Sequence, residues 1–192
     1  MNTKNNQRTR ISKMLLKNAL LDLLAEKKSV EKISVRELCE RAELNRSTFY
    51  AHYSAPKDLL DETEDEILAA AAEHLFKIGK ANDRNAADYI LSFLKYIKSN
   101  DKTFRILLLD VADSGFRAKF IRESTGKIMD SFDITLQASE EQYIYSYILN
   151  GSSSVVIQWI RSGYAIDETA LVALLLRMNK YLLEGVIRKP EG

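Results

Sequence analysis

The sequence predicts an all-α protein of about nine helices, and three observations support this prediction. Only two prolines and seven glycines occur among the 192 residues, so few positions interrupt a helix or mark the turns of a many-stranded sheet. Hydrophobic residues make up 46% of the chain, which is enough to bury a sizeable core. Several long segments repeat apolar residues every three to four positions, the period of an amphipathic helix. We therefore expect an N-terminal three-helix head joined to a C-terminal helical bundle.

The composition also argues against several classes of protein. Cys39 is the only cysteine, so an internal disulfide and a zinc site built from several cysteines are excluded. No segment approaches 18 consecutive apolar residues, and the polar first ten residues, MNTKNNQRTR, do not form the apolar part of a signal peptide. We therefore expect a soluble, cytoplasmic protein that does not enter a membrane and has no metal or other cofactor.

The overall charge of +1 hides an asymmetry along the chain. Residues 1–57 carry 12 lysines and arginines against 6 acidic residues, whereas residues 58–192 carry 16 against 21. A basic segment can be an ordinary solvated surface, but nucleic acid and anionic membranes also select for it. The asymmetry predicts a basic N-terminal domain over residues 1–57 and a mildly acidic C-terminal domain over residues 58–192.

The first expected element is an amphipathic helix of roughly five turns over residues 9–28. Its apolar stripe is formed by Ile11, Leu15, Ala19 and Leu23. Its first half is crowded with basic residues, namely Arg8, Arg10, Lys13 and Lys17. The N-terminal end of a helix already carries positive dipole charge, so helix stability alone does not favour these residues. They indicate an additional partner.

The next two helices are short and closely spaced. Ser34 and Glu37 have the spacing of a capping box, which predicts a helix that begins at Val35. The hinge AELN follows, and Asn45 at its end is a good N-cap for a third helix over residues 46–53. Two short helices joined by a tight turn predict a helix-turn-helix, in which the second helix lies in the major groove of DNA.

Side chains of these two helices divide into an inner and an outer set. The apolar inner set, which should hold the helices together, is Leu38, Ala42, Leu44 and Phe49. The outer set on the third helix is Arg46, Ser47, Thr48, Tyr50 and His52. Burial of an unpaired polar group costs about 1–3 kcal/mol, so we expect the outer set to face a partner rather than a core.

Residues 10–60 resemble the TetR/AcrR family of transcriptional regulators. The resemblance lies in the order of a long helix, ISVRELCERA, STFYAHY and PKDLL, and in the joint spacing of Leu38, Ala42, Leu44, Phe49, Tyr50, Tyr53, Lys57 and Leu60. Glu43 departs from the pattern, because many members have glycine in this turn. A left-handed conformation there would cost a residue other than glycine about 1 kcal/mol, which a folded domain tolerates. Residues 150–175 also look like the end of a subgroup of this family.

The resemblance implies a role for each polar residue of the head. Arg36 would reach a base edge or a phosphate at the rim of the groove. The expected base-reading residues are Arg46, Ser47 and Thr48, and arginine favours guanine as a bidentate partner. The expected phosphate-binding residues are Tyr50, His52, Tyr53 and Lys57. The implied partner is double-stranded DNA with a palindromic operator.

A fourth helix should begin at Pro56 and form the only covalent route from the head to the body. Five more helices are expected over residues 84–99, 102–112, 115–135, 140–162 and 168–187. The candidate caps of these helices are Asp101, Ser139 and Asp167 at N-termini and Gly163 at a C-terminus.

The last two helices are expected to form a homodimer, because family members pair through a four-helix bundle of these helices. The expected interface residues are Ile144, Ile148, Gly151, Val155, Trp159, Leu171, Leu175, Met178 and Leu182. Alternatively, a single chain could bury both apolar stripes in its own core.

The resemblance further implies that a small apolar or aromatic effector controls DNA binding. Aromatic residues that could line a cavity for it are Phe76, Tyr89, Phe93, Tyr96, Phe104, Phe120 and Phe132. Each of these residues could equally be part of an ordinary core.

No phosphate-binding loop, G-x-S-x-G motif or metal-ligand pairing of histidine with acidic residues is present, so we expect no enzymatic activity. The sequence therefore favours a dimeric repressor that an effector releases from DNA. One alternative is a DNA-binding co-regulator or activator controlled by a protein partner. Another is a bundle that binds a membrane surface, although the outer set lacks the lysine-rich face of such helices.

Overall fold

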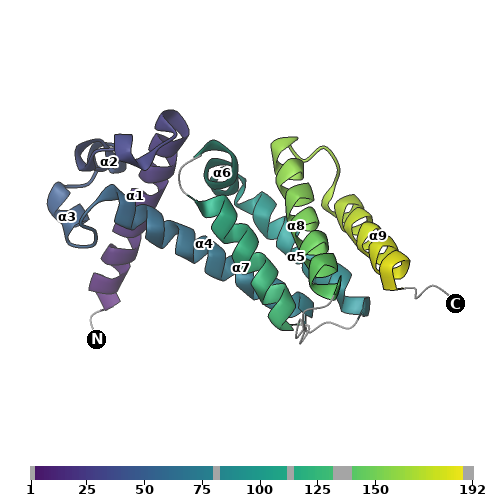
Figure 1. Cartoon of the computed structure of the whole chain (residues 1–192). Coiled ribbons are helices and arrows are strands. Elements are labelled where there is room, and N and C mark those ends of the chain that lie inside the picture. Colours follow the sequence, from purple (N-terminus) through teal and green to yellow (C-terminus); the bar gives the residue numbers. More distant parts are fainter. Residues whose placement is uncertain (1–2, 80–82, 112–114, 132–139, 188–192) are drawn as a thin grey trace, which may run out of the picture. The chain divides into compact units, whose positions relative to one another are not determined.

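A computed structural model of the protein describes residues 3–79, 83–111, 115–131 and 140–187, and these residues form nine α-helices and no strand (Figure 1). The all-α prediction is confirmed. The helices are α1 (Thr3–Lys27), α2 (Val35–Ala42), α3 (Arg46–Tyr50), α4 (Pro56–Gly79), α5 (Asp83–Ser99), α6 (Asp101–Arg105), α7 (Phe116–Ser131), α8 (Glu140–Arg161) and α9 (Glu168–Ile187). A 3-10 turn, η1 (Val30–Lys32), precedes α2, and a π-helical segment, η2 (Ile106–Asp110), continues α6. Within the described ranges, no helix is long and apolar enough to cross a membrane.

The chain divides into two compact units. The first unit comprises Met1–Ile67 and Lys102–Arg117, and the second comprises Leu68–Asp101 and Ala118–Gly192. The chain therefore passes from one unit to the other three times, inside α4, inside α6 and inside α7. By this division α4 is one of three covalent connections between the two units, whereas the sequence suggested a single connection between head and body. The division into functional domains after Lys57 stays a prediction.

Residues 102–117 join the first unit because η2 packs on α1. The side chains of Ile106, Leu107 and Leu108 are buried, and Val111 donates its backbone N–H to the carbonyl of Ile106 over 3.0 Å. The sequence predicts only one more helix of the C-terminal bundle over residues 102–112. The periodicity of its apolar residues does not specify which neighbouring helix will cover them. Ion pairs reinforce the contact: Lys28 lies 3.1 Å from Asp110.

The core of the first unit is built on the second half of α1. Buried residues of α1 begin at Leu16 and continue to Leu24, and α1 packs on α2. From α2 and α3, Leu38 and Phe49 are fully buried. The predicted inner set is therefore largely confirmed, although Leu44 is only half-buried.

Local capping explains where α2 begins and ends. The Ser34 hydroxyl accepts the backbone N–H of Glu37 over 3.2 Å, and the Glu37 carboxylate accepts the backbone N–H of Ser34 over 3.0 Å, so the predicted capping box is confirmed. At the other end, Leu44 donates its N–H to the carbonyl of Cys39, while Glu43 adopts φ 54° and ψ 40°. This left-handed residue ends α2 in the manner of a Schellman motif.

Other predicted caps have mixed outcomes. Asp167 accepts the N–H of Ala170 over 2.8 Å at the start of α9, as predicted. Gly163 adopts φ 71° after the end of α8, also as predicted. Asn45 precedes α3 but its side chain makes no capping bond, and Asp101 lies inside α6 instead of preceding it. Ser139 lies outside the described residues.

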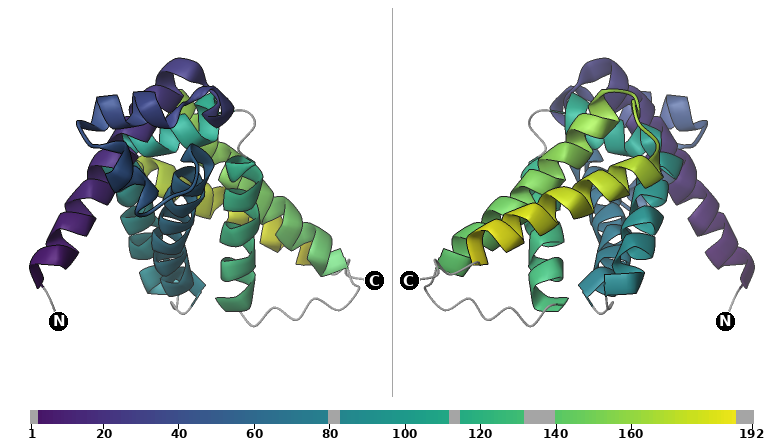
Figure 2. Two further views of the ribbon diagram at one scale, coloured as in Figure 1. Left: turned by 90° about the vertical axis from the view of Figure 1, so that its left-hand side faces the viewer. Right: turned by 90° about the vertical axis from the view of Figure 1, so that its right-hand side faces the viewer.

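The second unit contains α5, α8 and α9, and α9 packs on both α5 and α8 (Figure 2). The turn between α8 and α9 is closely held. The indole N–H of Trp159 donates to the carbonyl of Ile166 over 2.7 Å, and the Tyr164 ring contacts the Trp159 ring edge to face at 4.6 Å. The Tyr164 hydroxyl donates to the Asp101 carboxylate, and Lys98 pairs with Glu168 over 2.9 Å.

The left-handed conformation of Glu43 generates a prediction about stability. Replacement of Glu43 by glycine removes the steric cost of this conformation and should raise the free energy of unfolding by about 1 kcal/mol in urea titrations. The matched control is Glu40→Gly inside α2, where glycine should instead destabilise by a similar amount. Destabilisation by both substitutions would show that Glu43 is not strained.

Candidate nucleic-acid interface

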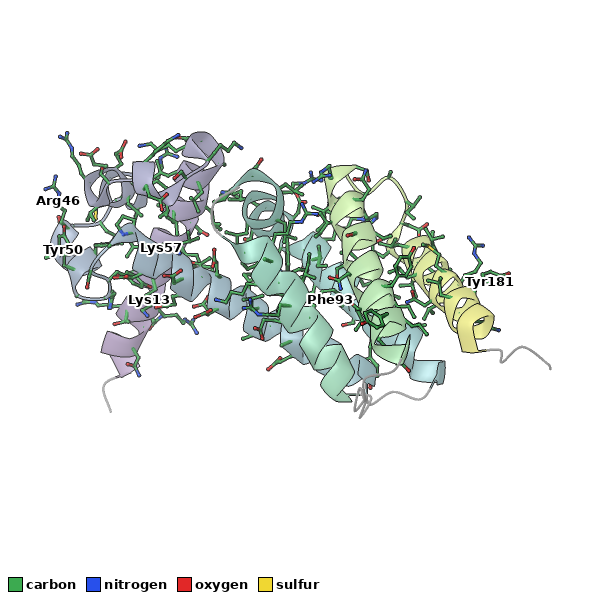
Figure 3. The ribbon with its side chains drawn as sticks, in the orientation of Figure 1. Lys13, Arg46, Tyr50, Lys57, Phe93 and Tyr181 are labelled. Atoms are coloured by element: carbon green, nitrogen blue, oxygen red, sulfur yellow. The ribbon has the colours of Figure 1, made fainter. Side chains whose placement is uncertain are left out.

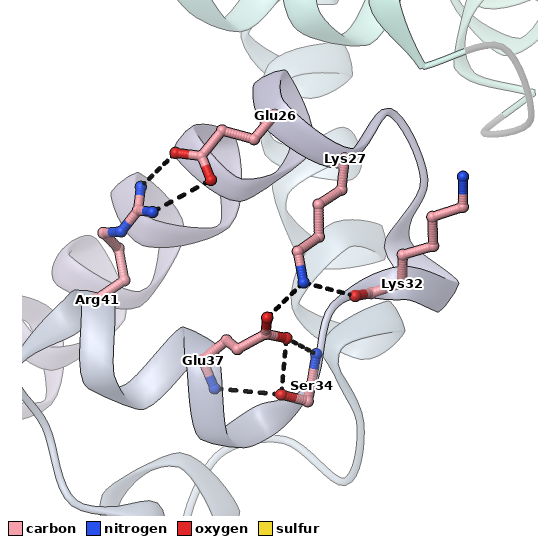
Figure 4. A network of polar contacts seen from close by, with 6 residues as sticks. All are labelled: Glu26, Lys27, Lys32, Ser34, Glu37 and Arg41. Carbon is pink, nitrogen blue, oxygen red and sulfur yellow. Dashed lines mark hydrogen bonds and ion pairs between the residues drawn. The ribbon is translucent and has the colours of Figure 1, made fainter.

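Helix α2 is held against α1 by a network of charged hydrogen bonds (Figure 4). The Lys27 ammonium donates to Glu37 over 2.5 Å and to the Lys32 carbonyl over 2.9 Å. One turn further along α2, the Arg41 guanidinium forms two parallel bonds of 2.9 and 3.2 Å to Glu26. The paired fork geometry restricts the rotation of α2 about α1 more than a single contact would.

The network also explains an unusual acidity. The Lys27 ammonium and the two hydrogen bonds from Ser34 lower the pKa of Glu37 from 4.5 to about 2. Each of these groups stabilises the charged carboxylate in the folded protein. The carboxylate of Glu37 therefore contributes stability that depends on pH.

Helix α3 presents the side chains of Arg46 and Tyr50 outward (Figure 3). Arg46 and Ser47 are exposed, and Thr48 is half-buried. Among the residues that the structure describes, the Arg46 guanidinium has no ion-pair partner. Tyr50 is 59% exposed, while its ring edge contacts the buried Phe49 at 5.5 Å. The exposed end of α3 thus combines an unpaired cation, a hydroxyl and an aromatic ring, which suits contact with base edges and phosphates.

The other predicted contacts of the head are already occupied within the chain. Lys57 pairs with Asp61 over 2.5 Å, and Arg36 pairs with Glu40 over 2.7 Å. Both pairs connect residues four apart on one helix and are exposed. Exposed pairs of this kind contribute little to stability, so a phosphate could replace either carboxylate.

Two members of the predicted phosphate set lie further in. His52 is half-buried, with its ring 6.1 Å from that of Tyr53. Tyr53 is only 5% exposed and lies 5.6 Å from Phe49, with the Lys13 ammonium 5.3 Å from the centre of its ring. Burial, and then the negative charge of Glu62, raise the pKa of Tyr53. Tyr53 therefore belongs mainly to the core of the first unit, and it is the only buried member of the set.

Sequence reasoning missed the carboxylates that neutralise the basic residues of α1. The Lys13 ammonium bonds to both oxygens of Glu62 at 2.9 and 3.0 Å, and Lys17 lies 2.5 Å from Glu66. These pairs join α1 to α4 across 49 positions of sequence. The acidic run DETEDE over residues 61–66 was the available signal, but only the packing of the two helices aligns the charges.

The predicted effector residues are divided between the units. Phe104 is fully buried in the first unit, while Tyr89, Phe93, Tyr96 and Phe120 belong to the second. The rings of Phe93 and Phe120 stack with centres 6.4 Å apart, and both side chains are buried. Tyr96 stacks on His74 at 5.0 Å. The Phe76 side chain and Phe132 lie outside the description.

The predicted dimer residues also fall into two groups. Those already buried within a single chain are Ile148, Trp159, Leu171 and Leu175. Those that stay partly or largely exposed are Ile144, Gly151, Val155, Met178 and Leu182. The chain buries the first group itself, and α9 packs on both α5 and α8, so a second chain could cover little more than the second group. A β-carbon built on Gly151 would meet no atom within 4 Å, so this position faces open space.

The sequence did not single out three exposed tyrosines of the last two helices. Tyr143, Tyr147 and Tyr181 are between 67% and 71% exposed. Figure 3 shows Tyr181 pointing away from α9. Across the described residues, no group of three or more His, Cys, Asp or Glu side chains could hold a metal ion.

Comparison with known proteins finds that the chain is similar to transcriptional regulators. Residues 84–181, half of the chain, match the TetR model described as the transcriptional regulator C-terminal region. A stretch of 68 residues is 31% identical to the uncharacterized HTH-type transcriptional regulator YxbF of Bacillus subtilis (strain 168). This stretch is 35% of the chain but only 18% of that protein, so the chain spans a small part of the curated relative it matches.

Two solved structures share the fold. A TetR transcriptional regulator from Streptococcus agalactiae 2603V superposes with a TM-score of 0.66 at 24% identity, covering 91% of this chain and 97% of that one. NalD, the secondary repressor of the MexAB-OprM multidrug efflux pump in Pseudomonas aeruginosa, has a TM-score of 0.66 at 16% identity, covering 97% and 100%.

The Glu37 network predicts a pH-dependent loss of stability. Because the folded pKa of about 2 lies below the ordinary 4.5, the stabilisation is complete above about pH 5 and is lost as the pH falls toward 2. Glu37→Gln should therefore lower the melting temperature at pH 7, and the difference from the natural protein should narrow below about pH 4.5. The control is Glu73→Gln, an exposed position of α4. A difference that is constant from pH 7 to pH 2.5 would contradict the assignment.

Proposed function

The chain belongs to the TetR family of transcriptional regulators, and from this premise we propose that it is a homodimeric repressor that a small-molecule effector releases from a palindromic DNA operator. The observation that carries the proposal is the exposed end of α3. There, Arg46 projects without an ion-pair partner among the described residues, beside the exposed Ser47 and Tyr50. A DNA-binding role agrees with the cytoplasmic location expected from the sequence and requires no enzymatic activity.

Reading of base sequence is assigned to the start of α3. Arg46 can approach guanine with two parallel hydrogen bonds, and Ser47 and Thr48 can bond to either kind of base. The pairing of Arg36 and Lys57 with neighbouring carboxylates supports a different role for these residues. Their charge is available to the DNA backbone at small cost, which anchors the protein without reading sequence.

Dimerisation is assigned to α8 and α9. The exposed apolar and aromatic side chains of these helices are Tyr143, Tyr147, Met178 and Tyr181. Large exposed side chains on two packed helices favour an interface, and the open space at Gly151 would allow close approach of a second backbone. Two recognition helices related by a two-fold axis then match a palindromic operator.

Control by an effector requires that changes in the second unit alter the first. Such coupling is favoured by α4, α6 and α7, because each of these helices has residues in both units. It is also favoured by two adjacent residues of α6. Asp101 accepts a hydrogen bond from Tyr164 in the α8–α9 turn, and Lys102 pairs with Asp22 of α1. Since both residues lie on one short helix, movement of the turn would be carried to α1. The expected effector is apolar or aromatic, near the stacked Phe93 and Phe120.

The first test is selection of bound sequences from random duplex DNA, followed by affinity measurements between ~50 and ~200 mM salt. Phosphate contacts release counterions, so the affinity should fall steeply across this range. Enrichment of no sequence, together with an affinity that ignores salt, would refute the DNA-binding proposal.

Substitutions should separate base reading from anchoring. Arg46→Ala should cost about 1–3 kcal/mol on the selected operator and relax the preference at one base pair of each half-site. Lys57→Ala should weaken all duplexes about equally and reduce the salt slope. Competition with single-base operator variants measures both patterns. Indistinguishable patterns for the two variants would mean that the roles are misassigned.

The dimer interface has its own test. Met178 is 42% exposed on α9, and a charge buried there without a partner would be strongly disfavoured. Met178→Glu should therefore give a monomer by light scattering at low micromolar concentration. Ala173→Glu adds the same charge at an exposed position on a different side of α9 and should leave the dimer intact. A Met178→Glu protein that stays dimeric would move the interface elsewhere.

A further inference from the structure

The first half of α1 extends beyond the core of its own unit. Helix α1 begins at Thr3, but among its described side chains, which start at Asn6, the first buried one is that of Leu16. From residue 6 to residue 15 every described side chain is exposed or half-buried. In Figures 1 and 2 the first turns of α1 extend away from α2. We name residues 3–15 of this helix the α1 arm.

The α1 arm exposes apolar side chains that a core would normally cover. Ile11 is 43% exposed, Met14 is 54% exposed and Leu15 is 36% exposed. Their spacing of three and four positions puts them on one side of the helix. Arg8 lies one turn before Ile11, and Arg10 lies one turn before Met14, so two of the three exposed apolar residues have a cation beside them. A helix with this exposed face requires a partner that accepts both kinds of side chain.

The charge of the α1 arm points to a polyanion. No acidic residue occurs before Asp22, and the first turn of α1 contains none. Lys13 is neutralised by Glu62, but Arg8 and Arg10 are exposed and have no ion-pair partner among the residues described. Both arginines lie near the N-terminal end of the helix, where the dipole adds positive charge. Helix stability is reduced by this arrangement unless an anion is bound.

We propose that the α1 arm is a second DNA-binding element, which contacts phosphates and sugars of the base pairs that flank the site read by α3. Arg8 and Arg10 would bind phosphates, and Ile11 and Met14 would pack on deoxyribose or on thymine methyl groups. The proposal rests on the proposed DNA-binding function of the head.

The composition of the α1 arm favours DNA over a membrane surface. Helices that lie on membranes present a broad apolar face with tryptophan, phenylalanine or leucine. The apolar side of the α1 arm is narrow, because Ile11, Met14 and Leu15 are its only large apolar side chains and none of its residues is aromatic. Its polar positions include Asn6, Gln7 and Thr9, which can hydrogen-bond to phosphate. The span of the arm is also suitable, because the twelve steps of 1.5 Å from residue 3 to residue 15 reach about 18 Å, roughly five base pairs of duplex.

The test removes one arm charge at a time and measures binding to the selected operator at several salt concentrations. Arg8→Gln and Arg10→Gln keep a good helix former at each position. Each should make the slope of log affinity against log salt shallower by about 1.8, since a dimer carries two arms and each lost contact changes the slope by about 0.9. Arg161→Gln removes the same charge from an exposed position of α8 and should leave the slope unchanged.

Trimming the operator locates the contact. Removal of the base pairs outside the α3 half-sites should weaken the natural protein to the level of the Arg8→Gln, Arg10→Gln double variant, and should leave that variant unaffected. Equal weakening of both proteins by trimming, or arm variants that match Arg161→Gln, would overturn the proposal while leaving the DNA-binding function intact. Absence of salt-dependent binding by the natural protein would refute the proposed function itself.

Two further outcomes would assign the α1 arm to another partner. Arm variants that bind DNA normally but lose binding to anionic phospholipid vesicles would overturn the proposal in favour of a membrane. Variants that bind DNA normally but change the mass of the protein in light scattering would overturn it in favour of a second copy of the chain.

Discussion

Helix α3 is too short to be stable alone, and this constraint governs the arrangement of the first unit. Five residues form little more than one turn, and an isolated helix of that length is not populated in water. The helix exists because Phe49 is fully buried against the rest of the unit, while Tyr50 beside it stays exposed. One buried ring therefore sets the rotation of α3 and determines that Arg46 and Ser47 face outward. The proposed reading of base sequence by α3 depends on that rotation.

Helix α3 packs on α2, and α2 in turn packs on α1. The leucines of α1 provide the apolar surface, and the bonds from Lys27 to Glu37 and from Arg41 to Glu26 restrict rotation of α2 on that surface. Charged hydrogen bonds are directional, whereas apolar packing tolerates sliding. The combination gives α2 and α3 a defined orientation on a helix that is itself anchored to α4 by Lys13 and Glu62.

Internal ion pairs also determine which cations of the basic N-terminal segment are available. Carboxylates of α4 neutralise Lys13, Lys17 and Lys57. Arg8, Arg10 and Arg46 have no such partner among the residues described. The net charge of the segment therefore overstates the positive potential near the α1–α4 contact. It also hides the fact that the unpaired positive charge is concentrated on α3 and at the start of α1. The paired lysines hold the unit together, and the unpaired arginines are left for a partner.

Elements with local causes could be predicted from the amino-acid sequence. The all-α class, the capping box at Ser34, the left-handed turn at Glu43 and the cap at Asp167 all depend on interactions within a few residues, which spacing and residue type report directly. Other features could not be predicted, because they arise from packing in three dimensions. Contacts between segments far apart in the chain place residues 102–117 in the first unit and bury Tyr53. Such contacts also pair Lys13 with Glu62 and leave the side chains of the α1 arm uncovered. Periodicity shows that a helix has an apolar face, but it does not specify which distant surface covers that face or whether any surface does.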